Sequence, residues 1–78
     1  MRLRDVIGRV SMVDPASISD NGRLLGFGID SIRLIELVMN LEEEFSIKIE
    51  PEQLFGVSTV RELASHIEGL TAMQHDVR

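Results

Sequence analysis

The residue of this chain best placed to do chemistry is Ser31, which lies in the stretch Gly28-Ile29-Asp30-Ser31-Ile32. The stretch opens a long amphipathic run, so we expect Ser31 in the first turn of a helix. A helix N-terminus presents backbone N–H groups without intrahelical partners, at the positive end of the helix dipole. These features favour an attached anion, such as a phosphodiester on Ser31. Asp-Ser at a helix start is also common capping chemistry, and the residues alone leave both interpretations open.

The other residues with catalytic potential do not form a catalytic set. The chain has two histidines, His66 and His75, and no cysteine. A nucleophilic serine needs a nearby base that a third group orients, and His66 falls toward the polar side of its expected helix. We therefore predict that both histidines are surface residues, that the chain has no catalytic residue and that it is not an enzyme.

Two further motifs are also predicted to lack chemistry. The consecutive acids Glu42, Glu43 and Glu44 point about 100° apart on a helix, so they do not converge on one metal ion or proton. We expect a solvated face there and no metal site. The sequence Gly26-Phe27-Gly28 is a fragment of a phosphate-loop pattern, but the flanking strand is missing. We predict an ordinary loop.

The composition indicates one small soluble domain. Seventy-eight residues lie near the lower limit for a single apolar core, and no cysteine is present to form disulfides. No stretch resembles a signal peptide or a membrane span, so we expect a cytoplasmic monomer without membrane insertion. The net charge is −5, and seven acids against two bases between Asp30 and Glu52 account for all of it. Such a segment repels nucleic acid and favours partners with basic surfaces.

Helical periodicity predicts an all-α fold, namely a small four-helix bundle with three main helices and one short helix. The expected helices are Leu3–Val13, Ser31–Phe45, Pro51–Phe55 and a last helix that is capped by Ser58 and closes at Gly69. Asp30 is the expected N-cap of the second helix.

A long loop of residues 14–29 is expected between the first and second helices, with a turn at Asn21-Gly22. Four apolar residues are expected to pin this loop onto the core: Ile18, Leu24, Leu25 and Phe27. Residues 1–70 then form the domain. Residues 71–78 show no pattern and are predicted to be a disordered tail.

The helix expected over residues 31–45 has two distinct faces. Its core stripe consists of apolar residues at helical spacing, namely Leu34, Leu37, Val38, Leu41 and Phe45. A mixed edge of apolar and acidic residues begins beside Ser31 and consists of Ile32, Ile35, Glu36, Met39, Glu42 and Glu43. We interpret this mixed edge as a candidate surface for a partner.

The stretch from Gly28 to Ile32, followed without gaps by Glu36-Leu37-Val38-Met39 and Leu41-Glu42-Glu43-Glu44-Phe45, closely resembles the acyl carrier proteins. These phosphopantetheine-binding carriers have Asp-Ser-Leu at the head of an acidic second helix. The resemblance covers residues 3–70. It implies that a phosphopantetheinyl transferase moves 4′-phosphopantetheine from coenzyme A onto Ser31, between Asp30 and Ile32. The thiol of this arm would carry acyl groups as thioesters.

The resemblance also implies how partners bind. In that family the acidic second helix docks against basic patches on acyl-loading, synthase and transferase enzymes. This role falls on the mixed edge here, where charge would steer the encounter and Ile32 and Met39 would supply apolar contact. Family members also shelter acyl chains within the bundle.

Three departures from the family pattern indicate a dedicated set of partners, in fatty-acid-like, polyketide or other specialised biosynthesis. Ile32 replaces the usual leucine, Arg33 stands where fatty-acid carriers tend to have an acid, and residues 24–27 are unusually apolar. The Gly-Gly-Asp/His-Ser sequence of peptidyl carriers is absent, so an aminoacyl or peptidyl carrier is the second hypothesis. A helical interaction module without a prosthetic group is the alternative from another class.

Overall fold

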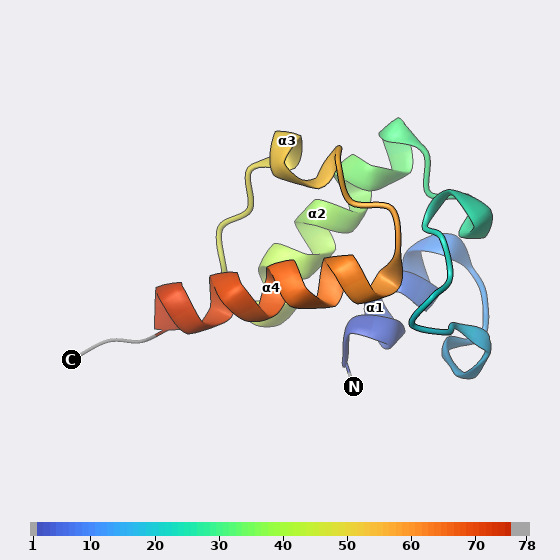
Figure 1. Ribbon diagram of the computed structural model, residues 1–78, viewed down its shortest axis with the longest axis horizontal. Helices are drawn as coiled ribbons and strands as arrows, with labels where there is room; N and C mark the ends of the chain where they lie inside the picture. Colours follow the sequence, from blue (N-terminus) through green and yellow to red (C-terminus); the bar gives the residue numbers. More distant parts are fainter. Residues whose placement is uncertain (1, 76–78) are drawn as a thin grey trace.

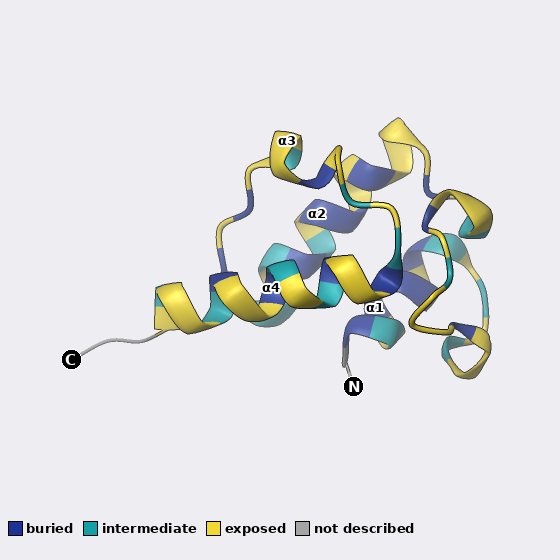
Figure 2. Ribbon diagram, in the orientation of Figure 1, coloured by how far each residue is buried: buried dark blue, intermediate teal, exposed yellow. Residues whose placement is uncertain are grey.

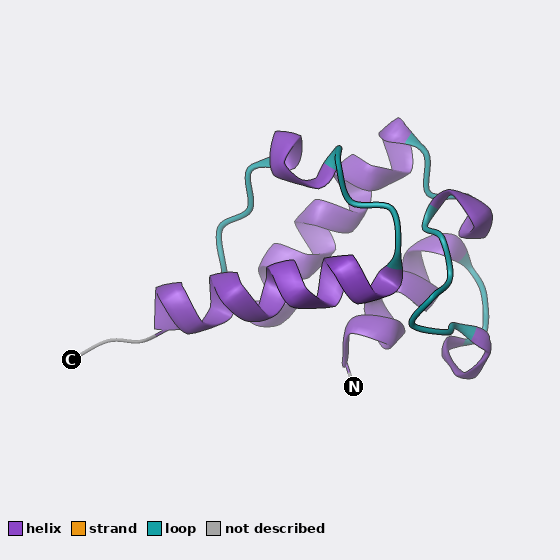
Figure 3. Ribbon diagram, viewed as in Figure 1, coloured by secondary structure: helices purple, strands orange, loops and turns teal. Residues whose placement is uncertain are grey.

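The computed structural model describes residues 2–75, which form a small helical bundle (Figure 1). Its α-helices are α1 (Arg2–Ser11), α2 (Ser31–Phe45), α3 (Pro51–Leu54) and α4 (Val60–His75). Single 3₁₀ turns, η1 (Pro15–Ser17) and η2 (Leu25–Phe27), lie in the long connection between α1 and α2. Over these residues Figure 3 shows helices and loops without a strand, so the predicted all-α bundle is confirmed.

The core of the described chain is entirely apolar. Leu37 and Leu41 of α2 are fully buried against Leu3 and Ile7 of α1 and Leu63 of α4 in one cluster. Figure 2 shows the buried positions on the inward faces of these helices. Full burial of a leucine contributes about 1.5–3 kcal/mol. The bundle is therefore held together by the stripes that the periodicity predicts.

The end of α1 differs from the prediction of Val13, because the helix stops at Ser11. Met12 adopts a left-handed conformation with φ 60°, and the Val13 N–H donates to the carbonyl of Gly8 at 3.1 Å. This hydrogen bond closes the helix in a Schellman-type turn. A Cβ on Gly8 would lie 2.7 Å from the Val13 oxygen, so the reversal of the chain needs a glycine there.

The long loop packs onto the bundle through some, but not all, of the residues predicted to do so. Ile18 and Leu24 are buried and Phe27 is half-buried, as expected, and the Gly22 N–H closes the predicted turn. Leu25, in contrast, is 72% exposed. Side chains three residues apart in a 3₁₀ turn share one side. Because Leu24 and Phe27 both face the core, Leu25 is left outside.

The loop also caps the start of α4. The first two N–H groups of the helix, from Val60 and Arg61, donate to the carbonyls of Gly22 (3.0 Å) and Asp20 (2.9 Å). These groups have no partner within the helix. The loop therefore supplies acceptors for two backbone N–H groups that have no hydrogen-bond partner within α4.

The N-cap of α4 is Thr59, whereas the sequence analysis predicted Ser58. Thr59 Oγ1 accepts from the Glu62 N–H at 3.2 Å, and the Glu62 carboxylate accepts from the N–H groups of Ser58 (2.7 Å) and Thr59 (3.3 Å). This reciprocal arrangement is a capping box, which the spacing Thr59-x-x-Glu62 specifies. The hydrogen bonds from Ser58 and Thr59, with Arg23 nearby, lower the pKa of Glu62.

The substitution Glu62→Gln is expected to lower stability at neutral pH and to lose this effect in acid. A carboxylate with a lower pKa in the folded chain contributes stability above its unfolded pKa, and that stability disappears as pH falls through the folded pKa. The difference between the urea midpoints of wild type and variant should begin to shrink near pH 4.5, the ordinary value for glutamate. A difference that stays constant with pH would show that the charge plays no part.

α4 extends beyond the predicted end at Gly69 and reaches His75. The side-chain amide of Gln74 bonds to the backbone of Lys48, which belongs to a distant segment. Such contacts hold the final turns in place, and helical periodicity does not reveal them. The prediction of a disordered tail is therefore wrong for residues 71–75, and residues 76–78 lie outside the described residues.

Candidate functional site

Ser31 is the first residue of α2, and its side chain is exposed. Asp30 is the N-cap as predicted, because its Oδ1 accepts from the Arg33 N–H at 2.9 Å. The Asp30 carbonyl accepts the Leu34 N–H at 2.8 Å and so begins the helix. The hydroxyl of Ser31 is therefore held at the positive end of a 15-residue helix, where an attached anion is favoured.

The turn before Ser31 depends on Gly28. This residue has φ 86°, a left-handed conformation that glycine adopts at little cost. It lets the Ile29 N–H return to the Leu24 carbonyl at 3.1 Å, and Ile29 is buried. The buried Ile29 anchors the chain directly before Asp30 and fixes the direction in which α2 leaves the loop.

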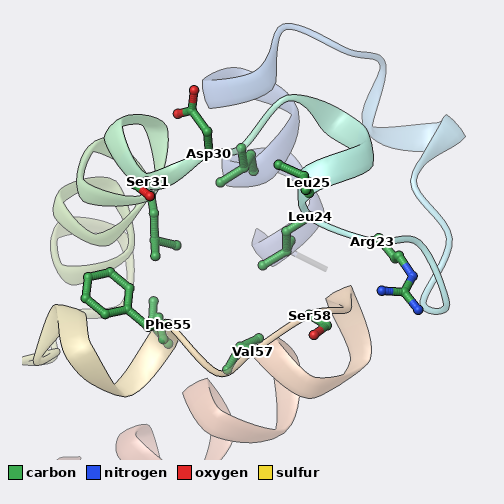
Figure 4. A pocket seen from close by; sticks show the side chains of 11 residues that line it. Arg23, Leu24, Leu25, Asp30, Ser31, Phe55, Val57 and Ser58 are labelled. Carbon is green, nitrogen blue, oxygen red and sulfur yellow. The ribbon is translucent and has the colours of Figure 1, made fainter.

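A cavity of about 320 Å³ opens beside Ser31 (Figure 4). Its lining is largely apolar and comes from the loop before α2, the start of α2 and the chain around α3: Leu24, Leu25, Ile29, Leu34, Leu54, Phe55 and Val57. In Figure 4, Ser31 and Phe55 lie on one side of the cavity, and Arg23 and Ser58 lie on the other. The hydroxyl of Ser31 is thus at the edge of a hollow that can receive an apolar chain.

Most of the mixed edge is exposed on α2. Ile32 is 81% exposed, Met39 63% and Ile35 43%, and Glu36 and Glu43 are also exposed. A cluster of large apolar side chains that are exposed to solvent on one helix is typical of a binding surface. The geometry of these five residues agrees with the predicted partner surface, while their role in binding stays a prediction.

Glu42 is the exception within the mixed edge. It is half-buried, and its Oε2 accepts from the N–H of Ile49 at 2.9 Å. The carboxylate thereby ties α2 to the segment that leads to α3. We therefore assign Glu42 a structural role and leave it out of the proposed partner surface.

Two apolar residues near Ser31 are exposed although the sequence analysis did not predict this. Leu25 is 72% and Phe55 is 64% exposed, and both line the cavity that Ser31 borders. They add exposed apolar side chains from η2 and from the end of α3 at the cavity beside Ser31. Neither position has a periodic pattern around it, because η2 and α3 are single turns, so no sequence signal distinguishes inside from outside there.

Arg33 has a partner that the sequence did not indicate. Its Nη1 donates to the carbonyl of Val10 at 2.8 Å, near the C-terminus of α1. A cation at that end of a helix interacts favourably with the helix dipole. The positive charge beside Ser31 therefore fastens the first turn of α2 to α1.

The structure does not bring a histidine to Ser31. His66 is half-buried on α4 rather than on the surface as predicted, and its Nε2 has no hydrogen-bond partner among the described residues. His75 is exposed, and its Nε2 lies 2.7 Å from the Ser46 carbonyl. Over residues 2–75 no three potential metal ligands cluster, and no helix is long and apolar enough to span a membrane.

Comparisons with known proteins identify the family of the chain. The family model described as the phosphopantetheine attachment site matches residues 2–67. The acyl carrier protein of Phaeodactylum tricornutum is 36% identical over 70 residues, which cover 86% of this chain and 90% of that protein.

Two solved structures share the fold at lower sequence identity. The HMG-ACPI domain of the CurA module from Lyngbya majuscula has a TM-score of 0.76 at 16% identity, over 92% of this chain and 74% of that one. A free-standing peptidyl carrier protein from Acinetobacter baumannii has a TM-score of 0.71 at 24% identity, over 86% and 84%. At these identities the likeness concerns the fold alone.

The fold and the site define a helical carrier protein, in which a serine at the head of α2 is presented beside an apolar cavity. The chain belongs to the acyl carrier proteins, the phosphopantetheine-binding family. It is a carrier and not an enzyme, and its cofactor is 4′-phosphopantetheine.

Proposed function

We propose that this carrier holds acyl intermediates as thioesters on a 4′-phosphopantetheine arm attached to Ser31. The observation that supports the proposal is the exposed Ser31 hydroxyl at the first position of α2, at the edge of the apolar cavity. The residues fit the group, because the N-terminus of α2 suits a phosphodiester. When bound, the arm supplies the thiol that this cysteine-free chain lacks.

Each residue around the serine has a distinct part in the proposal. Asp30 keeps the first turn of α2 formed through its hydrogen bond to the Arg33 N–H. Ile32 presents an apolar side chain next to the modified residue. Leu34 of α2 and Leu54 of α3, which both line the cavity, offer apolar contact to the cargo and keep water from it. We propose fatty-acid-like, polyketide or another specialised biosynthesis as the pathway, with the cytoplasm as the location.

The proposal is tested by incubating the purified chain with coenzyme A and a broad-specificity phosphopantetheinyl transferase. The intact mass should rise by one phosphopantetheine per chain. An unchanged mass, under conditions that modify a control carrier protein, would overturn the proposal and favour an interaction module without a prosthetic group. If the mass rises as expected, intact mass spectrometry of the protein from its own cells distinguishes an acyl from an aminoacyl cargo.

We further propose that partner enzymes bind the exposed surface around Ser31. These partners are the phosphopantetheinyl transferase and the acyl-loading, synthase and transferase enzymes of the pathway. The apolar part of this surface consists of Leu25, Ile32, Ile35, Met39 and Phe55. Glu36 and Glu43 add exposed negative charge on α2. A partner with an apolar groove and basic groups at its rim would be complementary to this surface.

Reversal of charge at Glu36 tests this surface. In the modification reaction, Glu36→Lys should raise the KM for the carrier several-fold at low ionic strength and much less at high ionic strength. The reason is that about 1 M salt screens exposed charges beyond about 3 Å. Glu68→Lys on α4 is the matched control, because it changes the net charge equally away from Ser31. Equal losses at all ionic strengths would contradict electrostatic steering.

A further inference from the structure

Ser46 ends α2 in the left-handed conformation (φ 55°), and residues 47–50 then run to α3 in an extended form without a neighbouring strand among the described residues. Ile47 and Ile49 are buried, whereas Lys48 and Glu50 are exposed, so the side chains alternate as they do in a strand. Figure 1 shows the segment leaving the end of α2 beside the last turns of α4 and running to α3. An extended chain in this position needs partners for its backbone groups from elsewhere.

The last turn of α4 supplies several of these partners. Gln74 Oε1 accepts from the Lys48 N–H at 2.7 Å, and Gln74 Nε2 donates to the Lys48 carbonyl at 2.9 Å. One side-chain amide thus bonds both polar groups of one residue, as a neighbouring antiparallel strand does. His75 Nε2 lies 2.7 Å from the Ser46 carbonyl, and because a carbonyl only accepts, the imidazole donates.

These contacts bear on the cavity beside Ser31. α3 is a single turn in which Leu54 is the buried residue, and Leu54, Phe55 and Val57 line the cavity. We call these three residues the α3 wall. The chain before this wall is held by the extended segment, and the chain after it by the hydrogen bond from the Leu24 N–H to the Ser58 carbonyl, at 2.9 Å.

We propose that Gln74 and His75 form a latch that holds the α3 wall against the cavity. Their release would loosen the extended segment at Ser46 and Lys48, while Glu42 still binds the Ile49 N–H, and would let the wall move away from Ser31. The latch consists of exposed side-chain hydrogen bonds, whose individual net contribution to stability is modest. It can therefore open locally while the helices stay folded. The proposed function enters this inference only in the purpose of the latch, which is to adjust the cavity to the cargo.

The latch is tested with a thiol placed at the buried position of the α3 wall. Because the chain has no cysteine, Leu54→Cys introduces a unique thiol at a position that is 1% exposed. Its reaction with an aromatic disulfide reagent then reports opening of the wall. Adding Gln74→Ala should accelerate the reaction about tenfold, through the loss of two hydrogen bonds. Gln74→Glu, which keeps the acceptor and loses the donor, should give an intermediate rate.

Met73→Ala is the matched control, because Met73 lies on the same turn and is 70% exposed. It should leave the rate unchanged. Local opening exposes little surface, so the rate in the Gln74→Ala chain should be insensitive to low concentrations of urea. A rate that rises with urea in step with global unfolding would reduce Gln74 to a general stabilising residue and overturn the latch. An equal acceleration by Met73→Ala would do the same.

Amide hydrogen exchange makes the same comparison in chains that keep Leu54. In Gln74→Ala the amides of Lys48, Ile49 and Phe55 should exchange about tenfold faster than in wild type, and in Met73→Ala they should not change. Unchanged exchange in Gln74→Ala would overturn the proposal. Both measurements use protein that carries no phosphopantetheine. Failure of the latch is therefore distinguishable from failure of Ser31 as the attachment site.

Discussion

The substitution Ser31→Ala should abolish the mass gain from coenzyme A and the transferase completely. The attachment needs a hydroxyl oxygen to form the phosphodiester, and alanine has none. The rest of the site should survive, because the cap of α2 depends on the Asp30 carboxylate and the Arg33 N–H and not on the serine side chain. Intact mass spectrometry measures the modification, and circular dichroism with urea unfolding checks that α2 remains folded.

Ser58 provides the matched control for this experiment. Its side chain lines the same cavity, on the side opposite Ser31 (Figure 4), but it precedes the cap of α4 and lies outside any helix. Ser58→Ala should therefore keep the full mass gain. A gain that persists in Ser31→Ala and disappears in Ser58→Ala would move the attachment site across the cavity. Loss in both variants, with the fold intact, would show that the cavity rather than one hydroxyl governs modification.

The second large effect is expected at Leu54, which anchors α3. Leu54→Ala should lower the free energy of unfolding by about 2–5 kcal/mol, because it removes a side chain that is 1% exposed from the core. Small domains have only about 5–15 kcal/mol in total. Urea unfolding followed by circular dichroism should show a large decrease in the midpoint of unfolding.

Phe55 is the natural comparison, because it is the next residue and is 64% exposed. Phe55→Ala should change the free energy of unfolding by less than about 0.5 kcal/mol, as expected for an exposed position. Its effect should appear instead as a higher KM for the carrier in the modification reaction. Similar losses of stability at the two positions would mean that α3 packs against the bundle in another orientation.

Much of the fold could be predicted because it depends on residues that are neighbours in sequence. The bounds of α2 and its cap at Asp30 follow from helical spacing and from a hydrogen bond that spans three residues. The core stripe of α2 repeats over several turns, so each position supports the next. The exposed apolar residues Ile32, Ile35 and Met39 follow from the same periodicity.

The end of α1 and the start of α4 were predicted less well, because at each of them two adjacent residues are similarly suited to the terminal position. α1 stops at Ser11 since Met12 takes the left-handed conformation, and non-glycine residues give little sequence signal for this. At α4 the sequence offers both Ser58 and Thr59 as caps. The spacing to Glu62 is the signal that favours Thr59, and it was available in the sequence.

By itself, the sequence determined an all-α chain in which a serine heads an amphipathic helix, and its resemblance to the acyl carrier proteins indicated a carrier. Only the tertiary structure decided that Leu25 and Phe55 border the cavity, that Glu42 is turned to Ile49, and that Gln74 holds Lys48. The physical reason is the range of the interactions. Helical periodicity and capping act over a few residues and are written into the local pattern. Contacts such as that of Gln74 with Lys48 join segments 26 residues apart, and only the packing of the bundle brings them together.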